Sequence, residues 1–522
     1  MGCAAVWGSP LIHAALVSAA MSRPNVLLVM ADQLAPHFTG AYDHPIVQTP
    51  AMDSLVERGA RFDATYCHSP LCAPARFTML SGQPVHKIGA WDNAAEFPAA
   101  VPTLAHYLRL VGYRTTLSGK MHYVGPDQLH GFDERLTTDI YPADFAWTPR
   151  WDNAGERIGK WYHGMDTLQE AGQAVATYQI DYDEEVGYQA TRRLYDLARD
   201  SDQRPWFVCA SFIHPHDPYV ARPEWWDLYN HDEIDMPDEW DAESRDPHTR
   251  RIREAIQAED VGYTPEQVRK SRHGYYANTT YFDSWIGRLV SVLEETNQLE
   301  NTVVIVTSDH GDMLGDRGVW FKMSFHERSA RVPLIMAGPG IANTTVTNVS
   351  SHLDLLPTVL DIATEGGAWP ELGAEMAGRS LIESATGGTD PVDETTGEYM
   401  GEMTSHPMFM IRRGRFKYIH CDTDPAQLYD IEADPLERAN LAGIVEHADL
   451  AAGFAAEVDT RWDRDGIRKE VLASQRARHA LHAAMAVGPQ HTWDFDPPRD
   501  VGNLYVRNHM DWSTAGPRSR YP

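Results

Sequence analysis

Four short apolar segments, each closing on a polar or small residue, constrain the fold of this chain more than any other feature. They cover residues 25–32, 206–214, 302–310 and 332–338. Continuous apolar runs of this length are typical of strands buried on both faces of a parallel sheet. Helical periodicity lies between these runs, at residues 103–111 and 276–295, and after the last one, at residues 353–363. This alternation predicts an α/β fold in which helices cover both faces of a large, mostly parallel sheet.

The composition and the hydrophobic pattern of the sequence change after about residue 365. A stretch rich in Gly, Glu and Thr is followed by a hairpin pattern at 408–420 that turns near Gly414, and by a helical pattern at 442–464. We therefore expect four parts, with an extended tail that contacts another subunit. They are an unstructured leader (1–22), a large N-terminal catalytic domain (23–365), a smaller C-terminal α+β domain with its linker (366–475) and the tail (476–522).

The formal net charge of −29 has the wrong sign for a protein that neutralises nucleic-acid phosphates, so we exclude nucleic-acid binding. Five scattered cysteines are too few for a disulfide framework or a CxxC zinc module, and they favour a reducing, cytoplasmic location. No segment reaches the roughly 18 uninterrupted apolar residues of a membrane span. The mildly apolar stretch 11–20 lacks the preceding Lys or Arg of a secretory signal.

The most specific local feature is the pattern Cys-x-Pro-x-Arg, from Cys72 to Arg76. With only five cysteines in the chain, chance explains it poorly, although a buried structural cysteine at the start of a helix would also fit. The pattern resembles the sulfatase signature, in which the cysteine is oxidised to formylglycine. That resemblance implies that one hydroxyl of the hydrated aldehyde attacks sulfur and that the second later helps to expel sulfate. Arg76 would steady the resulting oxyanion.

Metal-ligating side chains follow two of the apolar runs. Asp32 and Gln33 come at the end of the first run, and Asp309 and His310 at the end of the third. Since functional groups of open α/β sheets gather at strand ends, these residues and Cys72 predict a site for a hard divalent cation, Ca²⁺ or else Mg²⁺ or Mn²⁺. Asp32 alone could equally be a helix cap or an ion-pair partner. The Asp-His-Gly sequence resembles the alkaline phosphatase superfamily, in which many sulfatases have a second carboxylate where this chain has Gln33.

Three further junctions supply cationic or imidazole side chains: Lys120, His122, His216 and Lys322. Lysines at such positions are most often solvated loop tips. Their surroundings here resemble the sulfatase patterns Gly-Lys-x-His, Pro-His-x-Pro-Tyr and a lysine after the Asp-His-Gly loop. By that resemblance the four hold the sulfate oxygens, His122 acts as the base, and His216 with Lys322 protonates the leaving group. They would form a local positive pocket in an acidic protein.

A longer resemblance extends from about residue 23 to the end of the chain. The segments 69–74, 91–98, 117–147, 410–414 and 505–511 resemble choline sulfatases. The resemblance implies choline O-sulfate as substrate, a formylglycine-generating enzyme as maturation partner, and a homo-oligomer, dimer or tetramer. It also implies a substrate pocket made by Asn93, Trp147, His163, Glu402 and, from a neighbouring subunit, Asp511. Trp147 would hold the quaternary ammonium group by a cation–π contact, although a tryptophan can also simply be part of the core.

Two alternatives remain open at this stage. A phosphate or phosphonate monoester hydrolase of the same superfamily would use the same nucleophile and metal, because both ester types are tetrahedral and spread charge over their oxygens. A protein of a different class, a binding module for choline-like osmolytes, would keep Cys72 as an unconverted thiol.

Overall fold

The computed structural model describes residues 23–153, 163–237, 246–489, 492–498, 501–503, 507–511, 513–514, 517 and 520. The expected leader, residues 1–22, lies outside the described residues. No helix within these ranges is both long and apolar enough to cross a membrane.

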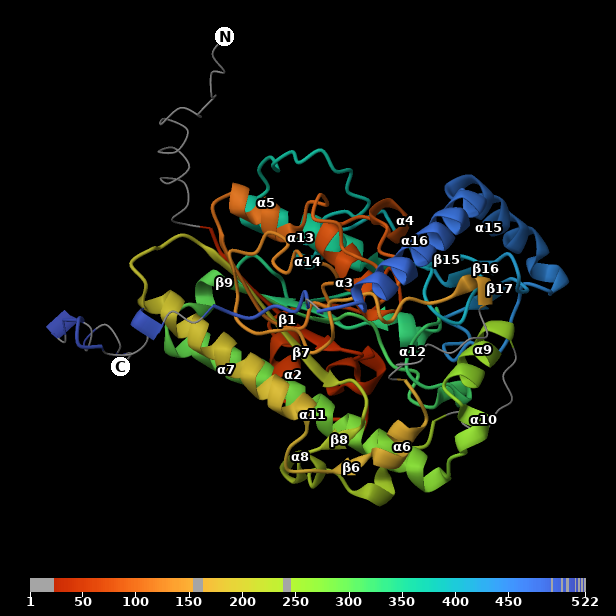
Figure 1. The fold of residues 1–522 in the computed structure, drawn as a ribbon, viewed down its shortest axis with the longest axis horizontal. Helices are drawn as coiled ribbons and strands as arrows, with labels where there is room; N and C mark the ends of the chain where they lie inside the picture. Colours follow the sequence, from red (N-terminus) through yellow and green to blue (C-terminus); the bar gives the residue numbers. More distant parts are fainter. Residues whose placement is uncertain are drawn as a thin grey trace, which may run out of the picture.

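One large sheet organises the N-terminal domain (Figure 1). Its strands, in spatial order, are β12 (Thr344–Val346), β2 (Gly59–Phe62), β11 (Leu334–Ala337), β9 (Thr302–Ser308), β1 (Asn25–Asp32), β7 (Trp206–Pro215), β4 (Arg114–Gly119) and β5 (Glu134–Arg135). The four strands β9, β1, β7 and β4 run parallel, and Leu28 in β1 is paired with both Cys209 and Ile305. The predicted α/β fold is therefore confirmed. The parallel strands also end at one edge, where the first and third apolar runs deliver their polar residues.

One of the four apolar runs differs from the prediction of a parallel strand. β11 is antiparallel to both of its neighbours, β9 and β2. The connection from β9 to β11 contains only a 3-10 turn (Asp316–Gly318), the short helix α12 (Glu327–Ala330) and the two-residue strand β10 (Arg331–Val332). Without a crossover helix the chain re-enters the sheet from the edge at which β9 ends, so β11 must run the other way.

Helices cover both faces of the sheet, and successive residues of β1 pack on opposite sides. Leu27 and Val29 belong to the apolar cluster that contains α7 (Tyr178–Arg199) and α11 (Pro265–Glu295). Val26 and Leu28 belong to a second cluster. Its helices are α3 (Cys72–Ser81), α5 (Leu104–Leu110) and α13 (Leu355–Thr364).

The C-terminal region contains a four-stranded antiparallel sheet. Its strands are β14 (Glu394–Tyr399), β15 (Met408–Arg413), β16 (Phe416–Cys421) and β17 (Gln427–Asp430). β15 and β16 form the predicted hairpin around Gly414. The helices α15 (Ala448–Arg461) and α16 (Arg464–Met485) follow. The tail expected from residue 476 therefore begins later, because α16 continues to Met485 and keeps one face buried.

Short elements complete the described structure. The remaining strands are β3 (Thr65–Tyr66), β6 (Gly172–Gln173), β8 (Val220–Ala221) and β13 (Ser350–Ser351). The remaining α-helices are α2 (Pro50–Val56), α4 (Val85–Ile88), α6 (Asp166–Glu170), α8 (Pro223–Trp226), α9 (Pro247–Ala255), α10 (Ala258–Val261) and α14 (Ile382–Ala385).

Candidate active site

Cys72 is the first residue of α3 and is completely buried. Its Sγ lies 3.2 Å from Nε2 of His310. Burial alone would raise the pKa of the thiol, but Lys120, Lys322 and His310 hold that pKa well below its ordinary value. The helix N-terminus also favours a negative charge here. Cys72 therefore lies in a strongly electropositive pocket.

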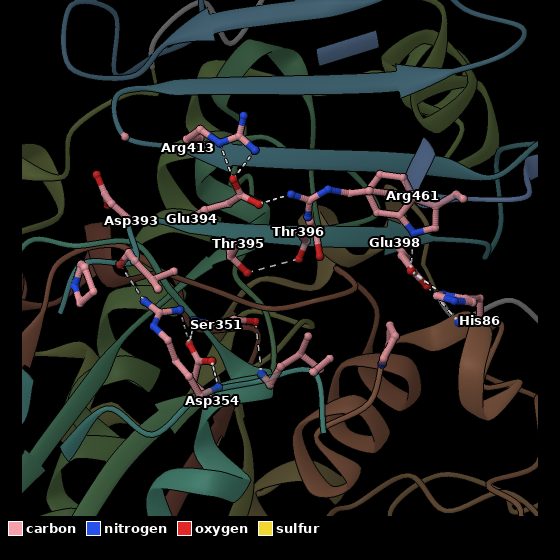
Figure 2. Close-up of a pocket in the computed structure, with 18 residues that line it drawn as sticks. His86, Ser351, Asp354, Asp393, Glu394, Thr395, Thr396, Glu398, Arg413 and Arg461 are labelled. Carbon is pink, nitrogen blue, oxygen red and sulfur yellow. Dashed lines mark hydrogen bonds and ion pairs between the residues drawn. The ribbon is translucent and has the colours of Figure 1, made fainter. Parts of the chain in front are cut away.

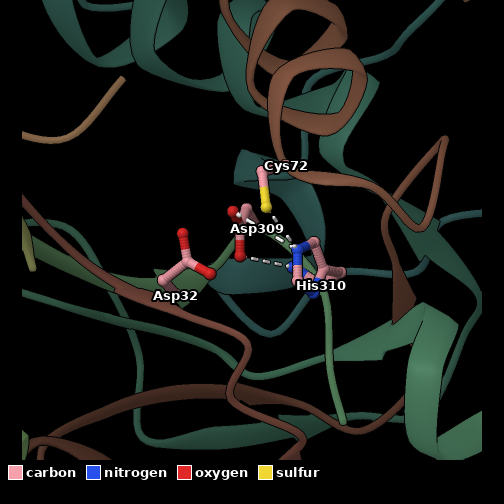
Figure 3. A group of neighbouring side chains, drawn as sticks. All are labelled: Asp32, Cys72, Asp309 and His310. Atoms are coloured by element: carbon pink, nitrogen blue, oxygen red, sulfur yellow. Dashed lines mark hydrogen bonds and ion pairs between the residues drawn. The ribbon is translucent and has the colours of Figure 1, made fainter. Parts of the chain in front are cut away.

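Four potential metal ligands meet at the edge of the sheet (Figure 3). One ligand atom from each of Asp32, Cys72, Asp309 and His310 lies within 4.8 Å of the others. Burial and the charge of Cys72 would raise the pKa of Asp32, but Lys120, His216 and Arg76 hold it well below its ordinary range. Oδ1 of Asp32 is buried and has no hydrogen-bond partner among the described residues, which leaves a carboxylate oxygen available to a cation.

Arg76 binds the carboxylates of this group from inside the protein. Its Nε donates to Oδ2 of Asp309 at 2.8 Å and its Nη2 to Oδ2 of Asp32 at 2.9 Å. Its Nη1 donates to the carbonyl oxygen of Lys120 at 2.6 Å and to Oγ of Ser211 at 2.8 Å. We expected Arg76 to contact a reacting oxygen. In this structure its guanidinium is bound to two carboxylates, a carbonyl oxygen and a hydroxyl group.

Gln33 connects the metal group to the cationic group. Its backbone N–H donates to Oδ1 of Asp309 at 3.0 Å, while its side-chain Oε1 accepts a hydrogen bond from Nζ of Lys322 at 2.6 Å. Its Nε2 donates to Asp312 at 2.8 Å and to Asp217 at 3.2 Å. The Gln33 side chain, expected as a metal ligand, is thus bound to Lys322 and two carboxylates in this structure.

The predicted cationic residues come together around Cys72. Lys120 forms an ion pair with Asp32, and its Nζ lies 4.4 Å from the centroid of the Tyr141 ring. Nζ of Lys322 lies 3.0 Å from Nε2 of His216. The His122 ring lies 5.3 Å, centroid to centroid, from the ring of Tyr141, and this histidine also lowers the pKa of the Cys72 thiol.

The backbone at the site is locally strained. Gln33 and His122 have positive φ angles of 66° and 59°, a region that non-glycine residues rarely adopt. Asp139 holds the backbone of His122 in place. Its Oδ2 accepts hydrogen bonds from the backbone N–H groups of Met121 at 3.0 Å and His122 at 2.8 Å. Such strain is concentrated where surrounding contacts fix a functional side chain.

A pair of stacked imidazoles lies on the side of Lys322. His163 stacks on His216 with 5.4 Å between ring centroids and on Phe321 with 4.5 Å. Burial, with the charge of Lys322, lowers the pKa of His163 to about 3, so this ring is neutral at physiological pH. Nδ1 of His163 and Nδ1 of His216 lie 3.5 and 3.1 Å from Oδ1 of Asp217.

Trp147 and Glu402, here called the aromatic and acidic region, each interact with residues of the cationic group. Trp147 makes edge contacts with His122 and Tyr141, at centroid distances of 5.7 and 5.2 Å. Glu402 is buried, and burial together with the charge of Asp92 raises its pKa to about 8. Cys72 raises that pKa further and Lys322 lowers it, so Glu402 interacts electrostatically with both residues.

Two further predicted residues differ in their placement. Oδ1 of Asn93 accepts the backbone N–H of Ala73 at 2.9 Å, so this side chain lies directly against the residue after Cys72. Asp511 is exposed and accepts hydrogen bonds from the Ser513 and Thr514 hydroxyls in its own turn. The single chain therefore does not give Asp511 a contact with the residues above.

Sequence reasoning assigned no role to Tyr141 and Asp217. Tyr141 lies between Lys120, His122 and Trp147, and its hydroxyl is 3.4 Å from Nε2 of His216. Asp217 follows His216 directly in the sequence, so the His-Pro-His-Asp-Pro-Tyr pattern carried a usable signal for it. Nothing local distinguished Tyr141 from the other tyrosines of the chain.

A cavity of about 850 Å³ lies between the N-terminal domain and the C-terminal sheet (Figure 2). Its charged side chains bind one another: Arg413 and Arg461 contact Glu394, and His86 contacts Glu398. It contains none of the predicted site residues in its lining. The site therefore lies at the ends of the strands and not in this cavity.

Residues 24–365 match the family model described as sulfatase. The chain belongs to the sulfatase family. Two C-terminal models also match: choline sulfatase enzyme C terminal at residues 469–521, and N-sulphoglucosamine sulphohydrolase, C-terminal, at 315–462. The choline-sulfatase of Rhizobium meliloti (strain 1021) is 44% identical over 509 residues, which are 96% of this chain and 99% of that relative. An arylsulfatase of Clostridium perfringens is 26% identical, over 81% of this chain and 91% of its own.

Solved structures support the fold of the enzyme. A 2-O GAG sulfatase has a TM-score of 0.65 at 24% identity and covers 86% of this chain and 92% of its own. The phosphonate monoester hydrolase of Agrobacterium radiobacter has a TM-score of 0.67 at 22% identity, with 88% and 96% covered. At these identities the likeness concerns the fold alone. The family and the 44% identical relative identify this protein as a sulfuric ester hydrolase.

Proposed function

We propose that the enzyme hydrolyses choline O-sulfate to choline and sulfate by S–O cleavage, with Cys72 converted to formylglycine. The observation that carries this proposal is the two-sided site. Lys120, Lys322 and the histidines beside Cys72 suit a sulfate group, and an aromatic and acidic region with Trp147 and Glu402 lies next to them. Choline O-sulfate is negatively charged at one end and positively charged at the other.

A divalent cation, Ca²⁺ by default, fits the oxygen-rich side of the site. Asp32 and Asp309 provide carboxylates, His310 an imidazole, and residue 72 the fourth group. The unpartnered Oδ1 of Asp32 supports this assignment, since a buried carboxylate oxygen without a donor is costly unless a cation satisfies it. When bound, such an ion would polarise a sulfate oxygen and stabilise the anionic form of the nucleophile.

The hydrated aldehyde of formylglycine would supply a hydroxyl group as nucleophile at the position of Sγ. Lys120 and Lys322 would bind the sulfate oxygens and stabilise charge as it develops on them. His122 would remove the proton from the remaining hydroxyl, and His216 together with Lys322, whose Nζ lies 3.0 Å from Nε2 of His216, would supply a proton to the leaving alcohol. Arg76 would hold both metal-binding carboxylates in place.

The quaternary ammonium group would lie against Trp147 and the carboxylate of Glu402. Methylated ammonium groups bind well to aromatic faces because the ring quadrupole attracts a cation that carries little water. Asp511 would reach such a group from a neighbouring subunit of a homo-oligomer, because within its own chain it is exposed. Maturation would need a formylglycine-generating enzyme.

Substrate comparison in water enriched in ¹⁸O tests the proposal. We expect kcat/KM for choline O-sulfate to exceed that for 4-nitrophenyl sulfate and for a phosphonate monoester, with the label recovered in sulfate. Faster hydrolysis of the phosphonate monoester would replace the proposal by the superfamily alternative. Label in choline would exclude S–O cleavage. Choline binding without turnover of any ester would indicate the osmolyte-binding alternative.

A further inference from the structure

One face of the C-terminal helix α16 is buried and changes in character along its length. Its buried residues are Ile467, Val471, Gln475 and Arg478. Ile467 and Val471 pack in the apolar cluster shared with the C-terminal sheet. Gln475 and Arg478, further along the same face, make polar contacts with loops of the N-terminal domain. α16 therefore joins the two domains through this face.

Arg478 connects two of these loops. Its guanidinium donates two hydrogen bonds of 2.7 Å to the two carboxylate oxygens of Asp92, and this ion pair is almost completely buried. Its Nη1 also donates to Oγ1 of Thr148 at 3.2 Å. Asp92 precedes Asn93, and Thr148 follows Trp147. Arg478 thus binds the immediate chain neighbours of two proposed substrate-binding residues without occupying the site itself.

Further bonds extend this arrangement to Glu402. Oε1 of Gln475 accepts the backbone N–H of Trp151 at 2.9 Å. The indole N–H of Trp151 in turn donates to the carbonyl oxygen of Gly401 at 2.9 Å, next to Glu402. A ring nitrogen of His479 lies 3.1 Å from the carbonyl oxygen of Pro149. One turn of α16 is therefore connected to the loops that carry Asn93, Trp147 and, through Trp151, Glu402.

The cationic side of the site is held by other parts of the chain. Arg76, in α3, binds the metal-ligating carboxylates, and Asp139, in the loop after β5, holds the backbone of His122. The contacts described above for Lys120 and Lys322 involve Asp32, Gln33 and His216, all at strand ends. A change in α16 should therefore affect the loops of Trp147 and Glu402 more than these contacts of the cationic side chains.

We propose that Arg478 is a positioning residue for substrate specificity: through Asp92 and Thr148 it fixes the loops that receive the ammonium group, and it has no part in sulfate transfer. This inference rests on the proposed function, because it assigns the Trp147 region to the choline end of the substrate. Since Arg478 does not touch the reacting atoms, its loss should change KM for choline O-sulfate far more than kcat.

The test compares Arg478→Gln with Lys469→Gln, an exposed lysine on the same helix. We expect Arg478→Gln to raise KM for choline O-sulfate about fivefold to tenfold, with kcat and the KM for 4-nitrophenyl sulfate changed less than about twofold. Lys469→Gln should match the wild type on both substrates. Equal losses on both substrates, or no change on either, would overturn the inference and leave a purely structural role.

Thr148→Val gives a second route if Arg478→Gln does not fold, since it removes the hydroxyl that accepts from Nη1 of Arg478 at nearly constant volume and leaves the charge of Asp92 unchanged. It should show the same selective rise in KM. Combining Arg478→Gln with Trp147→Ala should add little to Trp147→Ala alone, because the two act through one contact, whereas additive effects would contradict this. A wild-type enzyme inactive on choline O-sulfate but active on the aryl ester would refute the proposed function itself.

Discussion

The cationic side of the site is formed at the strand ends of the large sheet. The aromatic and acidic side is formed by residues from loops that are distant in sequence. Asp32, Asp309 and Lys120 directly end or follow parallel strands of the large sheet. Trp147 and Glu402 come from irregular segments of different domains. Different structural elements therefore position the residues for sulfate transfer and the residues for substrate preference. A substitution should be able to change the substrate preference without changing the rate of sulfate transfer.

The largest effect is expected at the shared nucleophile. Cys72→Ala should lower kcat at least about 10³-fold for both choline O-sulfate and 4-nitrophenyl sulfate, because both esters need the same attacking group. The thermal unfolding midpoint should change little. Cys209→Ala, at a buried cysteine in β7, is the matched control and should retain turnover. Wild-type rates in Cys72→Ala would remove the nucleophile from the mechanism.

Trp147→Ala should affect only the side of the site that binds the ammonium group. We expect KM for choline O-sulfate to rise about tenfold to thirtyfold, the loss of one desolvated cation–π contact, while the aryl ester changes less than about twofold. Steady-state kinetics on both esters measure this difference. Trp369→Phe, at a partly buried tryptophan that donates to Asp361, is the control. A similar rise in KM for both esters would exclude Trp147 from the ammonium site.

The protonation state of Glu402 should make the preference for choline O-sulfate depend on pH. Since burial and Asp92 raise its pKa to about 8, the side chain is mostly neutral at pH 7 and ionised at pH 9. An ionised carboxylate attracts the ammonium group, so the ratio of KM for choline O-sulfate to KM for 4-nitrophenyl sulfate should fall about threefold from pH 7 to 9. In Glu402→Gln the ratio should be flat. A pH-independent ratio in the wild type would contradict this role.

The smallest expected effect concerns stability. Because the pKa of Glu402 is raised on folding, the folded state keeps a proton that the unfolded state releases, and its stability contribution declines as pH rises from the ordinary carboxyl range to about 8. Glu402→Gln removes that pH-dependent loss. Its unfolding midpoint should exceed that of the wild type by about 1–3 °C at pH 8.5 and by less at pH 5. The same difference at both pH values would indicate an effect unrelated to ionisation.

The sequence predicts the cationic side better than the aromatic side, for a physical reason. A buried parallel strand has a recognisable apolar run, and its last residues must emerge at the common edge, so the strand pattern alone brings Asp32 and Asp309 together. The antiparallel direction of β11 cannot be predicted from its apolar run. The direction of a strand depends on the length and course of the connection before it and not on the strand's own composition.

The residues around Trp147 had no such local signal. Glu402 and Asp511 were named only through resemblance to a family. Asp92 and Arg478 are 386 positions apart, and neither lies in a pattern that indicates the other. The role expected for Arg76 also differs from its contacts, since a spacing of one helical turn shows which face of α3 a side chain shares but not which carboxylates already bind it.

The most direct test of the central claim is the mass of the peptide that contains Cys72, from protein purified from its native host. We predict a mass corresponding to CHO in place of CH₂SH at that position, in the fraction of the protein that hydrolyses choline O-sulfate. An unmodified thiol in fully active protein would contradict the formylglycine mechanism and the catalytic roles that depend on it.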